Sequence, residues 1–461
     1  MIAQPPSERT APRSLLARAV AATTRPHVLA LLAIIVLAIG LRLAWIAYVN
    51  PDPLDGRLDD TVFYVRAGQS LADGVGYTGL LGAPTAQWPP AYPFLLAGIY
   101  KAFGHNIIIP KVVNALAGGL TCLLIYLIAA RVFSRRVGLL GAFLFAVFPG
   151  QLFWSTLLMT ESLTPALLCL MLLLFIMWVV ERRDAGVLRY AILGAIFGVA
   201  LLARGEGAAL LLAALVAWRL VAPSWRQFGR EAGLFTAAAV LVVIPWTVRN
   251  AISMHAFVPV SSALGHTLLA GHQEDPYNPY HVFPEAKIQE EYSYLPFPER
   301  EIKVENVALR QSISFAVHHP LEEAYFPFVK FYHLFRSDAD AIGWINGWFT
   351  DGRLLAFSQQ AKDMWSELAN GYYRMVMLWA GLGIPLWFSI RDPKKLLLML
   401  FVGAWVAVHV MLWPSGRYHA ALTPIFALWA AVPLIAVYDT LVTRRSRAVA
   451  ATASSRATSG R

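Results

Sequence analysis

Two adjacent carboxylates, Asp59 and Asp60, follow an apolar segment by about ten residues, in the run Arg57-Leu-Asp-Asp-Thr-Val-Phe-Tyr64. Carboxylates at a bilayer surface are costly, so a pair at such a place indicates a function. A carboxylate can act there as a general base toward a hydroxyl group. Asp is also a favoured N-cap residue, and Asp60 directly precedes a predicted helix. A capping role therefore stays open for one of the two aspartates.

Further charged and polar residues interrupt the apolar pattern at intervals along the chain. Arginine suits a phosphate because its guanidinium is always charged and binds two oxygens at once. The candidates for a phosphate site are Arg204, Arg249, Arg417, Tyr418 and His419. Glu161 is a candidate for a further catalytic carboxylate. The candidates for the walls of a substrate cavity are Tyr64, Trp88, Tyr92 and Glu206.

Each candidate also has a structural alternative. Glu161 could cap the apolar segment that it begins and pair with an arginine. Arg204 and Arg249 could be anchors that extend toward the membrane surface. Tyr418 and His419 could belong to the aromatic belt at the interface. Five further histidines lack the spacing of metal ligands, which favours surface or packing roles for them. They are His266, His272, His281, His318 and His319.

The composition indicates an integral membrane protein. Of the 461 residues, 57% are hydrophobic and 14% are charged, against about one quarter charged in soluble domains. Cys122 and Cys169 both lie in apolar segments, which favours packing roles over a disulfide or a metal site. Segments of spanning character are predicted at 27–49, 108–131, 137–153, 161–180, 188–203, 206–221, 232–249, 371–390, 395–413 and 418–440.

The basic residues predict the orientation of these segments. With the N-terminus in the cytoplasm, every second loop carries the excess of lysine and arginine, as the positive-inside rule requires. Both termini are then cytoplasmic. The net charge of +10 is explained by topology, so a nucleic-acid partner is not predicted. All the polar candidates fall on the opposite, external face, which predicts one polar cavity that opens outward.

The chain divides accordingly into five parts. A cytoplasmic tail (1–26) precedes a transmembrane catalytic core (27–249), which includes the external loop 50–107. An external or interfacial segment (250–370), the C-terminal transmembrane helices (371–440) and a cytoplasmic tail (441–461) follow. Within the loop 50–107, helices in the interface are predicted over 61–71 and 93–103. Residues 302–336 predict an amphipathic helix, part of which enters the bilayer.

The chemistry that requires such a set of residues is transfer from a lipid-linked phosphate. Fixed arginines would hold the phosphate leaving group, and a carboxylate would serve the attacking hydroxyl. A secondary transporter is one alternative, but transporters place ionisable residues near the bilayer midplane in two matching halves. A ligase that moves a whole oligosaccharide from a polyprenyl diphosphate is a second alternative.

The motifs resemble one known group. They are Asp59-Asp-Thr-Val-Phe-Tyr64, Gly74-Val-Gly-Tyr77, Pro84-Thr-Ala-Gln-Trp-Pro-Pro-Ala-Tyr-Pro93, Thr160-Glu161, Leu201-Leu-Ala-Arg204, Pro245-Trp-Thr-Val-Arg-Asn250 and Gly416-Arg-Tyr-His419. In order and membrane position this set resembles the bacterial C-type (GT-C) glycosyltransferases that use polyprenyl-phosphate sugars, a family that includes protein O-mannosyltransferase-like and aminoarabinose-transferase-like enzymes. The resemblance implies an all-α polytopic bundle of about 10–12 transmembrane helices in the bacterial inner membrane.

The resemblance also implies the activity and the partners. A sugar would pass from a polyprenyl-phosphate donor to a hydroxyl of a cell-envelope glycan, lipid or protein, on the periplasmic face and with inversion. One aspartate of the pair would be the base or would orient the acceptor, and Glu161 would be the second acid. Arg204 and the cluster Arg417-Tyr418-His419 would contact the donor phosphate. Some relatives place a divalent cation (Mg²⁺ or Mn²⁺) beside the first acid and others do not, so the metal site stays open.

Overall fold

The computed structural model describes residues 26–54, 60–182, 186–274, 284–346 and 357–458, and within these ranges the chain is helical with no β-strand. The prediction of an all-α membrane bundle is confirmed. In the part of the chain that the structure describes, six helical stretches are long and apolar enough to cross a bilayer. They are α2 (Pro26–Tyr48), α5 (Ile108–Val132), Thr160–Val180 with α8 (Thr164–Phe175) inside it, α11 (Trp225–Met254), α19 (Pro393–Met411) and Gly416–Arg444, which includes most of α21 (Thr423–Thr458).

The remaining predicted spans are helical but shorter or more polar. The span predicted at 137–153 is divided into α6 (Arg135–Ala146) and α7 (Pro149–Trp154), because Pro149 has no N–H to continue the first helix. With 16 residues, α9 (Leu188–Ala203) rises about 24 Å, which is less than the hydrocarbon thickness. The others are α10 (Ala208–Val221), the charged α17 (Gln359–Leu382) and the short α18 (Ile384–Trp387).

The helices α9 and α11 form the most extensive helix pair in the bundle. Two glycines one turn apart on α9 make the close approach possible. A Cβ atom on Gly194 would collide with the carbonyl oxygen of Phe235, and one on Gly198 would lie 2.8 Å from that of Ala239. Small residues at this spacing allow membrane helices to approach backbone to backbone. This pair fixes the point at which α9 ends and the chain turns at Arg204.

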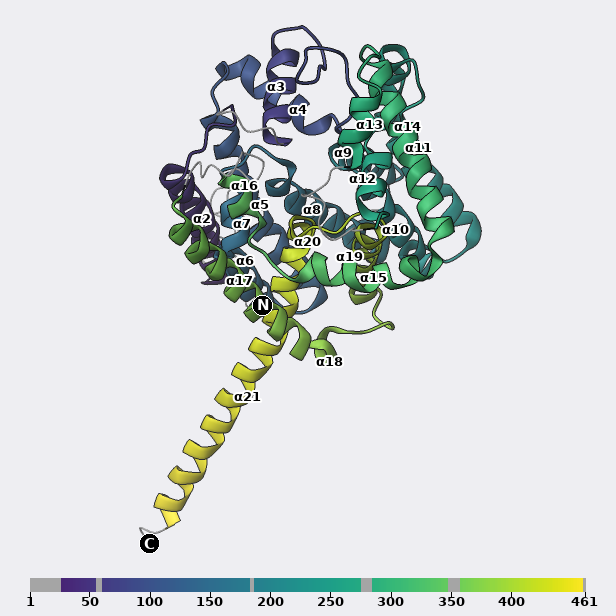
Figure 1. Ribbon diagram of the computed structural model, residues 1–461. Helices are drawn as coiled ribbons and strands as arrows, with labels where there is room; N and C mark the ends of the chain where they lie inside the picture. Colours follow the sequence, from purple (N-terminus) through teal and green to yellow (C-terminus); the bar gives the residue numbers. More distant parts are fainter. Residues whose placement is uncertain (1–25, 55–59, 183–185, 275–283, 347–356, 459–461) are drawn as a thin grey trace, which may run out of the picture.

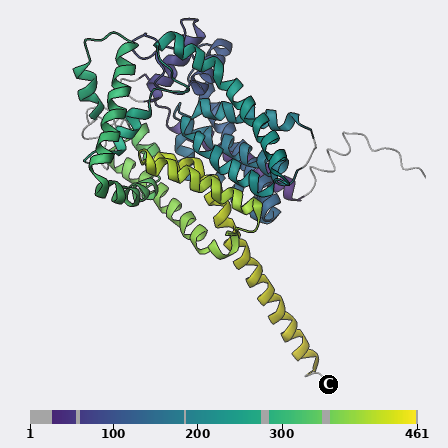
Figure 2. The ribbon, with the colours of Figure 1, turned by 90° about the vertical axis from the view of Figure 1, so that its right-hand side faces the viewer.

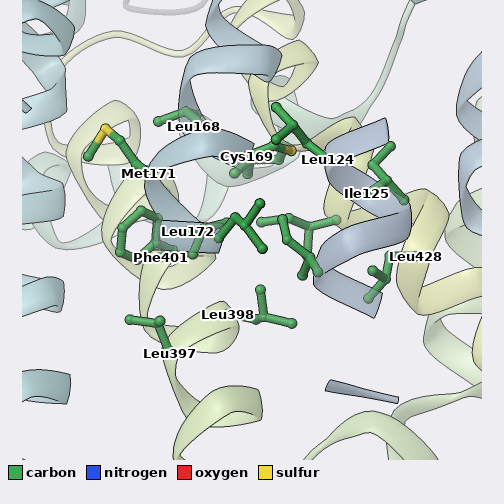
Figure 3. Packing of buried hydrophobic residues seen from close by; sticks show 14 of the residues in the cluster. Leu124, Ile125, Leu168, Cys169, Met171, Leu172, Leu397, Leu398, Phe401 and Leu428 are labelled. Carbon is green, nitrogen blue, oxygen red and sulfur yellow. The ribbon is translucent and has the colours of Figure 1, made fainter. Parts of the chain in front are cut away.

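The centre of the bundle is an apolar cluster to which distant segments contribute, as Figure 3 shows. Helix α8 lies in the middle and packs its buried side chains against α5, α19 and α21. The labelled members are Leu124, Ile125, Leu168, Cys169, Met171, Leu172, Leu397, Leu398, Phe401 and Leu428. Cys122 and Cys169 are both buried and unpaired, as predicted. The cluster holds the spans rigidly, so that the polar residues at their ends keep fixed positions.

A second layer of helices covers one end of the bundle, and we refer to it as the cap. It consists of α3 (Asp60–Ala72), α4 (Ala91–Phe103), α12 (Leu264–Gly271), α13 (Pro284–Glu291) and α14 (Glu299–His318). Figure 1 shows α3, α4 and α13 at this end, whereas α21 leaves the bundle at the other end. Figure 2 shows the same projection of α21 from the side. The helices predicted over 61–71 and 93–103 are therefore α3 and α4.

The helix predicted over 302–336 is two helices, α14 and α15 (Pro320–Phe335). Pro320 begins α15, because proline is favoured in the first turn and cannot continue the preceding helix. Leu321, Tyr325 and Phe328 lie on one face of α15 and are exposed. A contact of this apolar face with lipid stays a prediction.

Candidate active site

A cavity of about 510 Å³ lies between the cap and the ends of the spans. Its lining comes from α3, the loop before α4, the 3-10 turn Thr160–Ser162, the break after α9, α12 and the start of the last span. Eight of the residues singled out in the sequence line it: Asp60, Tyr64, Trp88, Glu161, Arg204, Glu206, Arg417 and Tyr418. Segments more than 350 residues apart thus meet at one place, as the ion pair between Asp60 and Arg417 shows.

Two arginines and three carboxylates alternate along one side of this cavity. Arg417 Nη1 lies 2.8 Å from Asp60 Oδ2, and Arg204 Nη1 lies 3.2 Å from Glu161 Oε1. Longer contacts of 3.9 Å join Arg417 Nε to Glu161 and Arg204 Nε to Glu206. The side chains of both arginines are largely buried, with 14% and 10% exposed. Each buried cation is therefore compensated by a carboxylate, as desolvated charges require.

Asp60 is held at the first position of α3. Its Oδ1 atom accepts a hydrogen bond of 3.1 Å from the indole nitrogen of Trp88, and Oδ2 accepts from Arg417. The Trp88 ring stacks on Phe63 with 3.8 Å between centroids, so its orientation is determined by packing. Burial raises the pKa of Tyr64, with a further contribution from the carboxylate of Asp60, so this phenol stays protonated in the cavity.

Arg204 reaches the cavity because α9 ends immediately before it. Its backbone is extended, and the following Gly205–Gly207 forms a 3-10 turn. The guanidinium donates to Thr160 Oγ1 at 3.2 Å as well as to Glu161. It also lies 5.2 Å from the centre of the Tyr418 ring. The apex Arg204-Gly-Glu-Gly207 predicted from the sequence is thus the turn that presents both charged residues.

Arg417 is positioned by the loop 337–339 and the start of α16 (Asp340–Ile345), which no motif in the sequence indicates. Asp340 Oδ2 accepts hydrogen bonds from the backbone N–H of Arg417 at 2.8 Å and from Ser415 Oγ at 3.0 Å. The guanidinium lies over the ring of Trp344, 5.0 Å from its centre. Gly416 packs directly against this loop. Asp340 orients Arg417 through a bond to its backbone N–H, and no local sequence motif indicates such a bond.

Arg249 does not line the cavity. Its two terminal nitrogens donate to the carbonyl oxygens of Thr85 and Tyr77, each at 2.6 Å. The guanidinium also lies over the rings of Tyr77 and Trp246. Arg249 thereby fastens the loop before α4 to the end of α11, a position that differs from the predicted phosphate contact.

His419 also lies away from the cavity, completely buried behind it. Its Nδ1 atom bonds the carbonyl oxygen of Leu334 at 2.6 Å, and Nε2 pairs with Asp338 at 3.0 Å. Tyr92 is buried beneath Tyr64 with ring centroids 5.3 Å apart and is not in the cavity lining. Asp59 lies outside the described residues.

Among the described residues, the carboxylates Asp60 and Glu161 of the cavity are paired with other groups and do not form a set of free ligands for a divalent cation. Both oxygens of Asp60 already accept hydrogen bonds, one of them from a guanidinium, and Glu161 is paired with Arg204. Within the described ranges, no three His, Cys, Asp or Glu side chains are grouped so that they could hold an ion. A hard cation requires several free oxygen ligands.

The chain is similar to known proteins both in sequence and in fold. Residues 87–248 match the family model described as dolichyl-phosphate-mannose-protein mannosyltransferase. The archaeal oligosaccharyltransferase AglB from Archaeoglobus fulgidus, in complex with an inhibitory peptide and a dolichol-phosphate, superposes over 92% of this chain with a TM-score of 0.54. The fold is that of the C-type glycosyltransferases. The resemblance inferred from the motifs is thereby confirmed.

The similarity to AglB is structural, since the sequence identity is 16%. The chain spans about half the length of that enzyme, 52%. The same archaeal enzyme in complex with Zn and sulfate gives a TM-score of 0.51 at 17% identity, over 91% of this chain and 50% of that one. ArnT from Cupriavidus metallidurans bound to undecaprenyl phosphate matches with a TM-score of 0.40 and 15% identity, over 87% and 77% of the two chains. No functionally curated protein sequence matches this chain.

Proposed function

We propose that this protein is an integral membrane glycosyltransferase that moves a sugar from a polyprenyl-phosphate donor to an acceptor hydroxyl, with inversion at the anomeric carbon. The observation that supports this most directly is the buried cluster of Arg204 and Arg417 with their carboxylates, in a cavity of a GT-C-like bundle. The match of residues 87–248 to a mannosyltransferase family model gives independent support.

In the proposed complex the two arginines hold the donor phosphate. Each guanidinium can exchange its carboxylate partner for a phosphate oxygen, and Arg417 keeps its position because Asp340 anchors its backbone. As the bond to the sugar breaks, the phosphate gains charge, and fixed guanidinium groups stabilise that charge in the transition state. The phenol of Tyr418 lies 3.4 Å from Arg417 Nη2 and lines the same place.

The carboxylates have the complementary roles. Asp60, released from Arg417 by the phosphate, orients the acceptor hydroxyl or receives its proton, and Asp59 belongs to the same proposal. Glu161 is the second acid and holds Arg204. We assign Arg249 and His419 to positioning instead, because neither side chain lines the cavity and each bonds groups of the protein away from it.

A hydrocarbon chain attached to the phosphate has an apolar route beside the arginines. Ala208, Ala209, Val408 and Leu412 line the cavity where α10 and α19 pack together. Burial of isoprenoid carbon against such a surface is favourable by about 25 cal/mol per Å². The donor would then lie with its phosphate at the cavity and its chain along these helices.

The same proposal includes the topology. The cavity and the cap face the periplasm, both termini lie in the cytoplasm, and the membrane is the bacterial inner membrane. The division into a tail (1–26), core (27–249), external segment (250–370), C-terminal spans (371–440) and tail (441–461) belongs to it. Cell-envelope glycans, lipids and proteins are the acceptor classes.

The test uses the full chain in lipid nanodiscs with a panel of radiolabelled undecaprenyl-phosphate sugars (mannose, glucose, galactose, arabinose and aminoarabinose) and cell-envelope extracts as acceptor. Label should pass to an acceptor from at least one donor. Arg417→Ala should bind undecaprenyl phosphate more weakly, whereas Arg66→Ala, on the exposed side of α3, should behave like the parent protein. Transfer only from polyprenyl-diphosphate oligosaccharides, or flux across sealed vesicles without transfer, would replace this function by one of its alternatives.

A further inference from the structure

A second cavity of about 200 Å³ adjoins the first on the side of the cap. It lies between the loop before α4 and helices α13 and α14. Gln87, Trp88 and His266 line both cavities, so the two spaces share one wall. The second cavity is smaller than the sites of about 300–1,000 Å³ that enclose drug-sized ligands. Its size therefore suits one ring of a second substrate next to the proposed donor site.

The shared wall has an aromatic surface with an amide group beside it. The indole of Trp88 is held by the ring of Phe63, with centroids 3.8 Å apart, and by its N–H bond to Asp60. Within the described part of the chain, no residue bonds the side-chain amide of Gln87, which is half-buried. A sugar ring has apolar C–H faces and a rim of hydroxyl groups. A rigid aromatic surface and an amide that both donates and accepts are complementary to such a ring.

The charged side chains around the second cavity disfavour an anionic ligand. Among the described residues of its lining, three carboxyl groups, those of Glu285, Glu301 and Glu305, face one guanidinium, that of Arg300. The Nε and Nη2 atoms of Arg300 already donate to two backbone carbonyl oxygens. Burial raises the pKa of Glu305, but with that group neutral the other two carboxylates still outnumber the guanidinium. A phosphate group on the acceptor would therefore meet charge of its own sign.

The walls of the second cavity use backbone groups for contacts within the protein. Glu301 accepts hydrogen bonds from the N–H of Ala86 at 2.8 Å and from Thr85 Oγ1 at 2.6 Å. The N–H of Ser262 donates to the carbonyl oxygen of Ala86 at 2.9 Å. An extended peptide that adds to an edge of the backbone binds mainly through such groups. Because these groups are occupied, the wall is better suited to a sugar than to a polypeptide.

We propose, on the basis of the transferase function above, that the second cavity is the acceptor site and that the acceptor is an uncharged glycan, one ring of which lies against Trp88 and Gln87. Asp60 is bonded to Trp88 and therefore lies beside the same wall. Once the donor phosphate has displaced Asp60 from Arg417, a hydroxyl of that ring passes its proton to Asp60. The hydroxyl oxygen forms the bond to the anomeric carbon. The bond from that carbon to the phosphate oxygen breaks, and its electron pair leaves with the lipid phosphate.

The experiment offers three groups of acceptors to the full chain in nanodiscs, with a donor that the radiolabel assay has identified. They are fluorescently tagged neutral oligosaccharides, the same oligosaccharides with a phosphate ester, and peptides that contain serine and threonine. The neutral oligosaccharides should react with a kcat/KM at least about tenfold above that of either other group. Where material of the cell-envelope extract is the only acceptor, its labelled product decides. An uncharged labelled glycan supports the inference, whereas a labelled protein or phosphorylated glycan overturns it.

Two variants test the place of the acceptor. Ala308→Leu puts a larger side chain into the second cavity and should raise the KM for the acceptor by about tenfold or more, with the affinity for undecaprenyl phosphate unchanged. Its control is Ala316→Leu, further along α14 and outside the lining. Gln87→Ala removes the amide without adding volume and should raise that KM by about 2- to 10-fold. Its control is Gln359→Ala, because the amide of Gln359 bonds Asp363 on the exposed surface of α17.

The possible results separate this inference from the function on which it rests. If the parent protein transfers no sugar from any polyprenyl-phosphate donor, the function fails and the inference with it. If the parent transfers sugar only to peptides or to phosphorylated acceptors, the inference is overturned and the function stands. The same holds if Ala308→Leu and Gln87→Ala, shown by thermal unfolding to be folded, keep the KM of their controls. If Ala308→Leu does not fold, Gln87→Ala alone decides.

Discussion

Gly416→Ala is a change of one methyl group that should weaken the proposed phosphate site without removing any charged residue. A Cβ atom at this position would lie 2.5 Å from the carbonyl oxygen of Ser337. It would also lie 3.0 Å and 3.1 Å from the two carboxylate oxygens of Asp340. Asp340 anchors the backbone N–H of Arg417, so the methyl group would displace the loop on which the orientation of Arg417 depends.

The magnitude follows from these distances. The nearest contact is about 0.9 Å shorter than the 3.4 Å at which ordinary van der Waals contact begins, and the obstacle is a backbone atom. Insertion of a methyl group into a site packed this closely costs about 1–3 kcal/mol. If the whole cost falls on donor binding, the affinity decreases by about 5- to 150-fold. If part of this free-energy cost instead falls on the stability of the folded protein, the unfolding temperature also decreases by a few degrees.

Undecaprenyl phosphate binding in nanodiscs, followed by tryptophan fluorescence, measures the first effect, and thermal unfolding measures the second. Gly403→Ala on α19 is the control, because a Cβ atom there meets nothing within 4 Å. That variant should bind normally. If Gly416→Ala matches Gly403→Ala in both measurements, the loop does not position Arg417 and the reasoning is refuted.

Three further changes test other parts of the structure. In Arg249→Lys, the single ammonium group cannot bond both carbonyl oxygens that the guanidinium reaches, so the free energy of unfolding should fall by about 1.5–3 kcal/mol. The affinity for undecaprenyl phosphate should not change. Weaker binding of undecaprenyl phosphate at unchanged stability would instead support the predicted phosphate contact of Arg249. Gly118→Ala would collide with the buried side chain of Arg42 and should lower the unfolding temperature, whereas Gly40→Ala, with free space around it, should not. Burial raises the pKa of Glu305 above its ordinary value of 4.5, so the folded state binds this proton more tightly than the unfolded state does. The free energy of unfolding should therefore decrease as the pH rises above 4.5 through the raised pKa of Glu305. Thermal unfolding at several pH values measures this dependence, and Glu305→Gln should make the unfolding temperature less dependent on pH in that range.

The spans of the bundle were predictable because membrane insertion depends on local hydropathy. The segments predicted at 27–49 and 108–131 correspond to Pro26–Tyr48 and Ile108–Val132. The breaks were less predictable, since Pro149 and Pro320 interrupt otherwise continuous apolar or amphipathic patterns. Local composition does not determine whether a proline ends a helix, since Pro245 lies inside α11 without ending it.

The candidate site, like the spans, was predictable from the sequence only in part. Topology alone placed Asp60, Glu161, Arg204 and Arg417 on one membrane face, and the structure brings them into one cavity. Topology does not determine the direction in which a side chain points. Arg249 lies at the same level, but the rotation of α11 directs it toward the loop before α4 rather than into the cavity.

The residues that support the site could not be found from the sequence. Asp340 bonds a backbone N–H 77 residues away, and a backbone partner leaves no trace in residue type. His266 lines the cavity from α12, although its spacing in the sequence favours only a surface or packing role. Such positions depend on tertiary packing.

The pairing of both buried arginines with carboxylates has a consequence for turnover. In the proposed transfer, two unpaired guanidinium groups would retain the doubly charged lipid monophosphate that the reaction releases, and its slow dissociation would limit the rate. Here Asp60 and Glu161 compete for the same cations. In the proposed reaction the free energy of product binding is then a difference between two ion pairs rather than the full value of one, so a spent lipid carrier would leave the cavity more readily.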